Sequence, residues 1–164
     1  MPEELPGDDD LNLPPSFFPT EPQGEEPPQI TLGEPIEVQI EGVYMAEKNG
    51  SVSHFVLLTD GERKLPILIG PFEAHAISLA LENGRSDRPM THDLLKTVIE
   101  KLDGDIDRVV IDDLWNTTYY AKIFLQKGDV EIGIDSRPSD AIAVAVRFDV
   151  PVYVSDGILE ASEE

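Results

Sequence analysis

The segment from Asp135 to Arg147, DSRPSDAIAVAVR, constrains the fold more than any other part of the chain. Its consecutive apolar residues, Ala141 to Val146, follow a polar stretch that is interrupted by one proline. At helical spacing the segment is apolar on nearly every side, so the helix that it predicts must be central to the core. Its polar sector within the helical turns holds Asp140 and Arg147, which share one face.

The start of this helix must satisfy its free backbone N–H groups locally, because a buried helix has no water to bind them. Pro138 fits the first turn, where its missing N–H costs nothing. If Arg137 is the N-cap, Asp140 occupies the third helical position, which favours a negative charge. If Ser136 is the N-cap, Ser139 takes that position. The sequence leaves both registers open.

Three antiparallel strands are predicted at the beginning of the domain. Apolar and polar residues alternate from Ile36 to Ile40, which is the period of a half-buried strand. The apolar positions change parity after Gly42, and a bulge there would account for the change. The Asn49-Gly50 pair predicts a hairpin turn, and the Asp60-Gly61 pair predicts a second turn.

The rest of the chain predicts two helices, three strands, the central helix and a last strand. The first helix starts at Pro71 and the second has Thr91 as its N-cap; a short helix after Ser155 would complete the domain. The order βββααβββαβ groups strands and helices, which indicates a compact α+β domain with an antiparallel or mixed sheet and three main helices. The core-facing stripe of the second helix is expected to be Leu94, Leu95, Val98, Ile99 and Leu102.

Charge and composition divide the chain at residue 30. The whole chain has 33 acidic and 12 basic residues, a net charge of −21. Residues 1–29 are rich in proline and acidic residues and contain no Lys or Arg, which predicts a disordered tail. Residues 30–164 are expected to form the folded domain. Within the tail, LPPSFFP (Leu13 to Pro19) is either a docking peptide for a protein partner or a casual hydrophobic cluster.

The net negative charge of the chain limits the classes of partner that it can bind. A negative surface repels nucleic acid, since non-specific binding comes from Lys and Arg that release counterions. It leaves a nuclease open, because acidic sites recruit divalent cations that attract phosphate. A third interpretation is that the acidity serves solubility or a salty cytoplasm.

Features that the sequence lacks exclude further kinds of functional site and location. The chain has no cysteine, which rules out a disulfide framework, a thiol nucleophile and a zinc–thiolate site. No apolar run reaches the length that spans a bilayer, and the N-terminus lacks the pattern of a secretory signal. We expect a cytoplasmic protein that has no membrane contact.

Glu73 and His92 are candidate catalytic residues in the two predicted helices. A helical projection aims Glu73 at the core in the first turn of its helix. There it is either held by the free N–H groups, or it is a carboxylate in an apolar wall that does chemistry or ligates a metal. His92 lies at the edge of the apolar stripe, as a boundary residue or a general base. Arg88 could reach the start of the second helix or a bound phosphate.

Asp135 and Arg137 are left without a capping role at the strand-to-helix corner. Arginine is a rigid fork of five donors that suits a carboxylate or a phosphate. Two carboxylates with an arginine between them, Asp135 and Asp140, could hold Mg²⁺ or Mn²⁺ and position phosphate oxygens. Internal Arg–Asp pairing would give the same spacing, so that alternative also stays open.

Four blocks together resemble the bifunctional nuclease domain family: LPILIGPFEAHAISLAL, RPMTHDLL, TYYAKIFL and IDSRPSDAIAVAVR. The similarity covers about Glu34 to Ile158, in the family's order and spacing. It implies a compact α+β fold, association as a homodimer in bacterial members, and the DNase and RNase activity ascribed to plant members. The positions in the matching blocks are Glu73, Arg88, Thr91, His92, Asp93, Asp135, Ser136, Arg137, Ser139 and Asp140.

The leading hypothesis is a metal-dependent nuclease that acts on DNA, RNA or both, with accessible single strands favoured over long duplexes. In this hypothesis Glu73, Asp135 and Asp140 ligate Mg²⁺ or Mn²⁺ or activate water, and His92 is a second acid–base group. The residues expected to bind substrate are Arg88, Arg137, Ser136 and Ser139. The rival hypothesis is a non-catalytic dimeric assembly module in which the same polar residues form caps and internal salt bridges.

Overall fold

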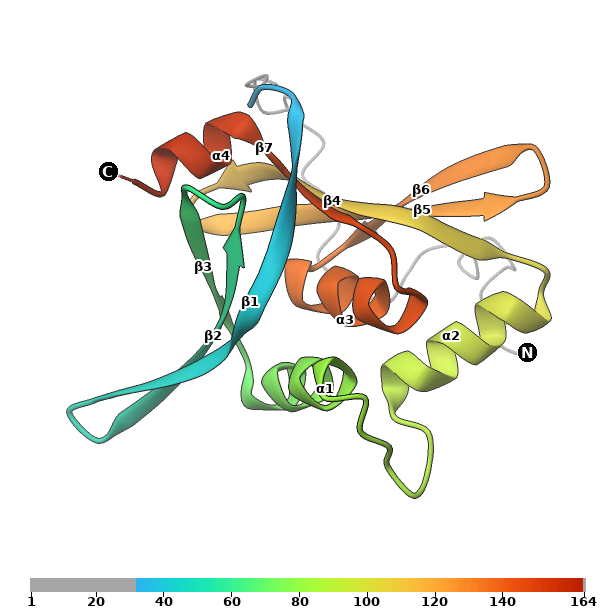
Figure 1. Ribbon diagram of the computed structural model, residues 1–164, viewed down its shortest axis with the longest axis horizontal. Coiled ribbons are helices and arrows are strands. Elements are labelled where there is room, and N and C mark those ends of the chain that lie inside the picture. Colours follow the sequence, from blue (N-terminus) through green and yellow to red (C-terminus); the bar gives the residue numbers. More distant parts are fainter. Residues whose placement is uncertain (1–31, 164) are drawn as a thin grey trace, which may run out of the picture. The chain divides into compact units, whose positions relative to one another are not determined.

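Strands and helices follow one another in the predicted order, with a short helix added at the end. The computed structural model describes residues 32–163, and Figure 1 shows their arrangement. The elements are β1 (Pro35–Lys48), β2 (Ser51–Thr59), β3 (Lys64–Ile69), α1 (Pro71–Leu81), α2 (Thr91–Lys101), β4 (Asp105–Trp115), β5 (Thr118–Lys127), β6 (Val130–Ser136), α3 (Pro138–Phe148), β7 (Val152–Ser155) and α4 (Asp156–Ala161). The predicted α+β class is therefore confirmed.

All seven strands belong to one mixed sheet in the order β3-β2-β1-β7-β4-β5-β6. Neighbouring strands are antiparallel except β4 and β7, which are parallel. The long strand β1 joins the two halves, because its first residues pair with β7 and the rest pair with β2. The register shifts between Ile40 and Gly42, which confirms the predicted bulge. Asn49 and Gly50 both have positive φ, as the tight hairpin turn requires.

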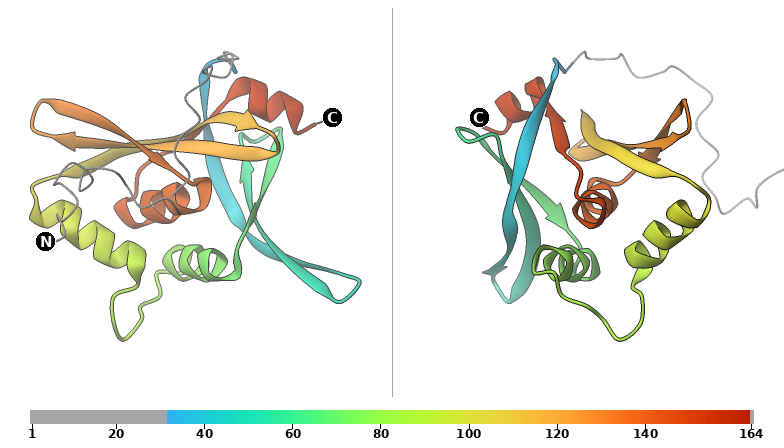
Figure 2. Two further views of the ribbon diagram at one scale, coloured as in Figure 1. Left: turned by 180° about the vertical axis from the view of Figure 1, so that it is seen from behind. Right: turned by 45° about the vertical axis from the view of Figure 1, so that its right-hand side comes forward.

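Helix α3 lies in the angle between the two halves of the sheet (Figures 1 and 2). It packs against α1, α2, β4 and β5. Residues Ala141 to Ala145 are at most 1% exposed, which confirms the central place predicted from their apolar pattern. The N-cap is Arg137, so the register that puts Asp140 in the first turn is the correct one.

The predicted core stripe of α2 is wrong. Four of its five residues are 40–63% exposed, and they are Leu94, Leu95, Val98 and Leu102. The helix packs on α3 through another side, where His92 is buried and the Lys96 ammonium lies 5.2 Å from the centre of the Phe148 ring. The apolar periodicity was real, but no other element of residues 32–163 covers that face.

The predicted N-cap of α2 is also wrong. Met90 is the N-cap and Thr91 is the first helical residue. The Met90 backbone N–H donates to the Asp93 carboxylate at 2.9 Å, which closes the start of the helix from its third position.

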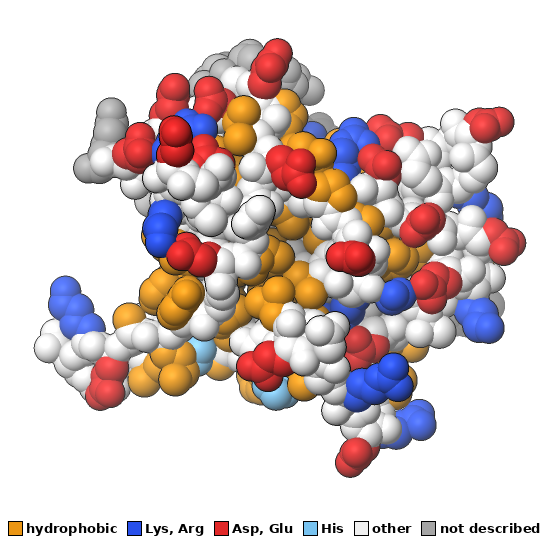
Figure 3. Space-filling model, viewed as in Figure 1, with side chains coloured by type: hydrophobic (Ala, Val, Ile, Leu, Met, Phe, Trp, Pro, Cys, Tyr) orange, Lys and Arg blue, Asp and Glu red, His pale blue; other side chains and the backbone are white. Residues whose placement is uncertain are grey.

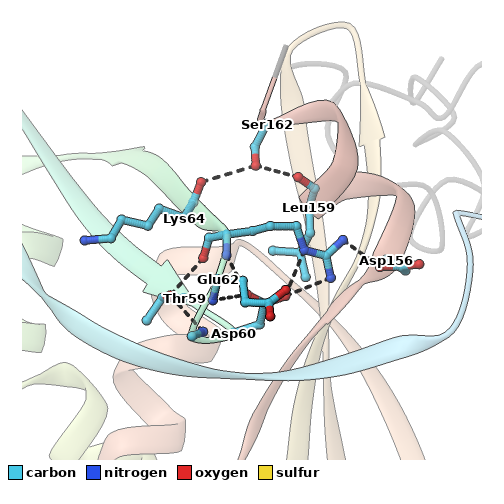
Figure 4. A network of polar contacts seen from close by, with 9 residues as sticks. Thr59, Asp60, Glu62, Lys64, Asp156, Leu159 and Ser162 are labelled. Atoms are coloured by element: carbon cyan, nitrogen blue, oxygen red, sulfur yellow. Dashed lines mark hydrogen bonds and ion pairs between the residues drawn. The ribbon is translucent and has the colours of Figure 1, made fainter.

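A polar network at the turn between β2 and β3 ties this turn to α4 (Figure 4). The Arg63 guanidinium bridges the carboxylates of Asp60 and Asp156, at 2.8 Å from each. The backbone N–H groups of Arg63 and Glu62 donate to Asp60 at 2.7 and 3.0 Å. These hydrogen bonds lower the pKa of Asp60 to about 2, so its carboxylate is ionised at neutral pH.

The predicted tail, residues 1–29 with the candidate docking peptide, lies outside the described residues, and its boundary with the domain stays a prediction. Among residues 32–163, none of the helices combines the length and apolar character needed to cross a bilayer. The cytoplasmic location expected from the sequence also stays a prediction.

Candidate active site

The first turns of three helices meet at one open pocket of about 370 Å³. We call it the helix-start pocket, and its lining comes from the beginnings of α1, α2 and α3. Neither α1 nor α3 has a side-chain cap, since their N-caps are Gly70 and Arg137. The backbone N–H groups in a first helical turn have no helical acceptor, and they carry the positive end of the helix dipole. The lining residues are Phe72, Glu73, His75, Ala76, Met90, Thr91, His92, Arg137 and Asp140.

Arg137 connects two carboxylates across this pocket. Its Nε donates to Asp140 Oδ2 at 2.8 Å, and its Nη2 lies 3.2 Å from Glu73 Oε1. The Arg137 side chain is nevertheless 65% exposed, whereas that of Glu73 is 20% exposed. Arginine has five N–H donors, so its contacts with the two carboxylates leave donors free to bind a ligand anion.

Asp140 also contacts His92, whose Nε2 lies 2.9 Å from Asp140 Oδ1. Burial alone would raise the pKa of Asp140, but the hydrogen bonds from Arg137 and His92 outweigh burial and lower that pKa. Asp140 is therefore ionised at neutral pH and can only accept hydrogen bonds. It follows that His92 Nε2 carries the proton that it shares with Asp140.

His92 is a buried group with one unused ring nitrogen. The residue is 9% exposed, and its Nδ1 is buried without a hydrogen-bond partner among the described residues. The polar contact of this ring with the described residues therefore runs through Nε2 and Asp140. The imidazole therefore acts on the pocket through Asp140, which it holds in place.

The position of the Glu73 carboxylate depends on Gly70. A Cβ at residue 70 would collide with the Glu73 carboxylate, which folds back over the N-cap of α1. Gly70 has a φ of −76°, which any residue can adopt. A larger residue at position 70 would therefore displace the flexible end of the Glu73 side chain and would not strain the backbone.

A second pocket of about 500 Å³ lies on the strand side of the same ion pair. We call it the strand-side pocket, and it shares Glu73 and Arg137 with the helix-start pocket. Its other walls come from β3, from the β4–β5 turn and the first residues of β5, and from the start of α3. Leu68, Tyr119 and Ser139 are among its lining residues. Burial raises the pKa of Tyr119, so its phenol stays protonated at neutral pH.

The model of the bifunctional nuclease domain matches residues 56–164, which is most of the chain. The chain belongs to the bifunctional nuclease domain family. The matched region contains both pockets and every predicted site residue.

Relatives in this family come from bacteria and plants. Uncharacterized protein Rv1829 of Mycobacterium tuberculosis is 36% identical over 123 residues, which are 75% of this chain and 73% of that protein. Bifunctional nuclease 2 of Oryza sativa subsp. japonica is 36% identical over 111 residues, 62% of this chain and 34% of that protein. Bifunctional nuclease 2 of Arabidopsis thaliana is 31% identical over 94 residues, 56% of this chain and 29% of that protein.

The predicted site residues of the bifunctional nuclease domain fall into two groups. Those at the helix-start pocket are Glu73, His92, Arg137 and Asp140, and Ser139 lines the strand-side pocket. Those outside both pockets are Arg88, Asp135 and Ser136.

Arg88, Asp135 and Ser136 lie in other parts of the structure. Arg88 is exposed in the loop between α1 and α2. Asp135 is exposed on β6, opposite Lys122 of β5. The Ser136 hydroxyl donates to the Arg137 carbonyl at 2.9 Å.

The predicted metal ligands were Glu73, Asp135 and Asp140. Within residues 32–163 no three His, Cys, Asp or Glu side chains are gathered so that they could hold a metal ion. Two of the predicted ligands, Glu73 and Asp140, do line the helix-start pocket. Mg²⁺ commonly takes one or two protein carboxylates and completes its shell with water and substrate phosphate. Both carboxylates contact Arg137, and the metal ion stays a prediction.

Sequence reasoning missed Phe72 and Tyr119, which line the two pockets of the bifunctional nuclease domain. For Phe72 a signal was present, because the projection that aims Glu73 at the core turns its neighbour toward solvent. For Tyr119 there was none, since alternation along a strand does not say which loop or helix faces it.

Proposed function

We propose that this protein is a nuclease, a hydrolase of phosphodiester bonds in DNA, RNA or both, and that the helix-start pocket is its active site. The proposal rests mainly on one observation: the exposed guanidinium of Arg137 lies between two carboxylates where three helices begin. The plant relatives are named bifunctional nucleases, which agrees with this activity.

Phosphate binding is the first role that we assign to the pocket. The free donors of Arg137 and the N–H groups in the first turn of α1 would bind phosphate oxygens, as helix N-termini do generally. Arg137 is positively charged at neutral pH. Its hydrogen bond to Asp140 and its attraction to the Asp140 and Glu73 carboxylates raise the pKa of its guanidinium.

Glu73 and Asp140 supply the chemistry in this proposal. Glu73 is the carboxylate that would take a proton from the attacking water. Asp140 is held ionised by Arg137 and His92, so it acts as an acceptor and not as a proton donor. Mg²⁺ or Mn²⁺, when bound by Glu73 and Asp140, would neutralise charge on the phosphate.

Acidic side chains are spread widely over the face shown in Figure 3, with Lys and Arg among them. Such a surface gives little of the general attraction that holds long duplexes. We therefore propose that the substrate is an accessible, unpaired nucleic acid that binds at the pocket itself.

The test compares Glu73→Gln with Glu82→Gln, which removes an exposed carboxylate from the end of the same helix. End-labelled single-stranded RNA and DNA are incubated with each purified protein in Mg²⁺, Mn²⁺ or EDTA. We expect metal-dependent cleavage by the wild type and by Glu82→Gln, and a loss of about 100-fold or more in Glu73→Gln. Equal cleavage by all three proteins, or none by the wild type, would refute the proposal.

A second candidate function, a dimeric assembly module, is favoured by the exposed face of α2. An apolar patch of this kind on a folded protein is typical of an interaction site. The occupant that we propose is a second copy of the chain. The patch consists of Leu94, Leu95, Val98 and Leu102.

Leu95→Glu should convert a dimer into a monomer in sedimentation equilibrium, because a charge cannot be buried unpaired in an interface. Met45→Glu, which changes a more exposed apolar residue on β1, should leave the dimer intact. A wild-type monomer would exclude this assembly, and a dimer that survives Leu95→Glu would place its interface elsewhere.

A further inference from the structure

Phe72 is the most exposed large hydrophobic residue among those that the structure describes, at 86% exposed. It is the second residue of α1 and lines the helix-start pocket beside Glu73 and Arg137. The core side of α1 is supplied by Ala74, Ala76 and Ile77, so Phe72 does nothing for the packing of its own helix. An aromatic ring kept in water beside a phosphate-binding arginine therefore needs another explanation.

We propose that Phe72 stacks against an unpaired base and makes the site selective for single-stranded nucleic acid. The inference rests on the proposed function, since the phosphate next to that base would be the one bound at Arg137. Aromatic side chains beside a cationic groove are the usual means by which proteins hold single strands, because every base offers a face for stacking.

The two pockets fit the two sides of a phosphodiester. They lie on either side of the Glu73–Arg137 pair, and a phosphodiester carries one nucleoside on each side of its phosphate. With the phosphate at Arg137, one base reaches Phe72 in the helix-start pocket. The neighbouring nucleoside then enters the strand-side pocket, between Leu68 and Tyr119.

The charge of the chain makes stacking more important here than in a basic protein. A net charge of −21 removes the long-range attraction that usually supplies most non-specific affinity. At the site itself, Arg137 is balanced by Glu73 and Asp140. Stacking must then add to the contacts at the phosphate, and bases inside a paired duplex cannot supply it.

The test measures binding of fluorescent phosphorothioate DNA of about ten nucleotides, a length that covers one single-strand site. Phosphorothioate linkages resist cleavage, so affinity is read by anisotropy in Mg²⁺ without turnover. The proteins are the wild type, Phe72→Ala, Phe72→Trp and the control Met45→Ala, which changes an exposed apolar residue of β1 outside both pockets. Each protein is tested with the single strand and with the same sequence as a duplex.

We expect Phe72→Ala to bind the single strand about five- to 150-fold more weakly, the range found for removing one stacked base. Phe72→Trp should restore binding, Met45→Ala should match the wild type, and the duplex should bind weakly to all four proteins. Unchanged single-strand affinity in Phe72→Ala, or duplex affinity equal to single-strand affinity, would overturn the role of Phe72 and leave the proposed nuclease standing. No binding or cleavage by the wild type would overturn both.

Discussion

Replacing Arg137 by Gln is expected to lower kcat/KM for phosphodiester cleavage by about 100- to 1000-fold, the usual loss when one positioned donor to a reacting oxyanion is removed. Arg137 is the cation that both carboxylates of the pocket contact, at 2.8 and 3.2 Å. The variant loses the phosphate donor and also releases Glu73 and Asp140 from their places. Arg137→Lys should recover only part of the rate, because an ammonium group keeps the charge but not the fork.

The fold should be insensitive to the same change. The Arg137 side chain is mostly exposed, and exposed ion pairs contribute at most about 1 kcal/mol to the free energy of unfolding. Steady-state kinetics and urea unfolding of the same samples separate the two effects. The control is Arg85→Gln, an exposed arginine outside both pockets. A rate that Arg137→Gln leaves within a few-fold of the wild type would place catalysis elsewhere.

The strands and turns could be predicted because the sequence specifies them locally. The alternation before Gly42, the bulge there and the Asn49-Gly50 turn each depend on neighbouring residues, and all three are present. The buried position of α3 could also be predicted from the residues of that segment alone. A helix that is apolar on nearly every side must lie in the protein interior. Ala141 to Ala145 are buried there.

The buried side of α2 could not be predicted from its sequence. Periodicity shows that one side of a helix is apolar, but it does not show whether other elements of the fold cover that side. Leu94, Leu95 and Val98 are exposed, whereas His92 on another side is buried against α3. The buried side is decided by how α2 crosses α3, which no spacing within α2 reveals.

Sequence spacing could predict only those contacts of the site that join residues close together in the chain. Arg137 and Asp140 are three residues apart at a helix start, and they pair as this spacing suggests. Glu73 and His92 join them from other helices, an arrangement that depends on tertiary packing. Asp135 is two residues from Arg137 yet lies outside both pockets, because β6 and not α3 sets its direction.

Arg147 lies in the last turn of α3, and its removal should cost far more stability than that of Arg137. Its side chain is 6% exposed, and its Nε donates to Asp93 of α2 at 2.7 Å. It also donates to the carbonyl oxygens of Ala143 at 2.9 Å and of Ala76 in α1 at 3.2 Å. One guanidinium therefore joins the three helices whose first turns form the helix-start pocket.

Arg147→Met should lower the free energy of unfolding by about 3 kcal/mol, at the lower end for a broken buried pair because Asp93 is partly exposed. Urea unfolding followed by circular dichroism measures the loss. Part of it comes from leaving the Asp93 carboxylate unpaired, so the double variant Arg147→Met/Asp93→Leu should lose less than the two single variants together. Strict additivity would mean that the two side chains do not interact. A loss below about 1 kcal/mol would mean that the helices are held by their apolar contacts alone, and that the pocket does not depend on this arginine.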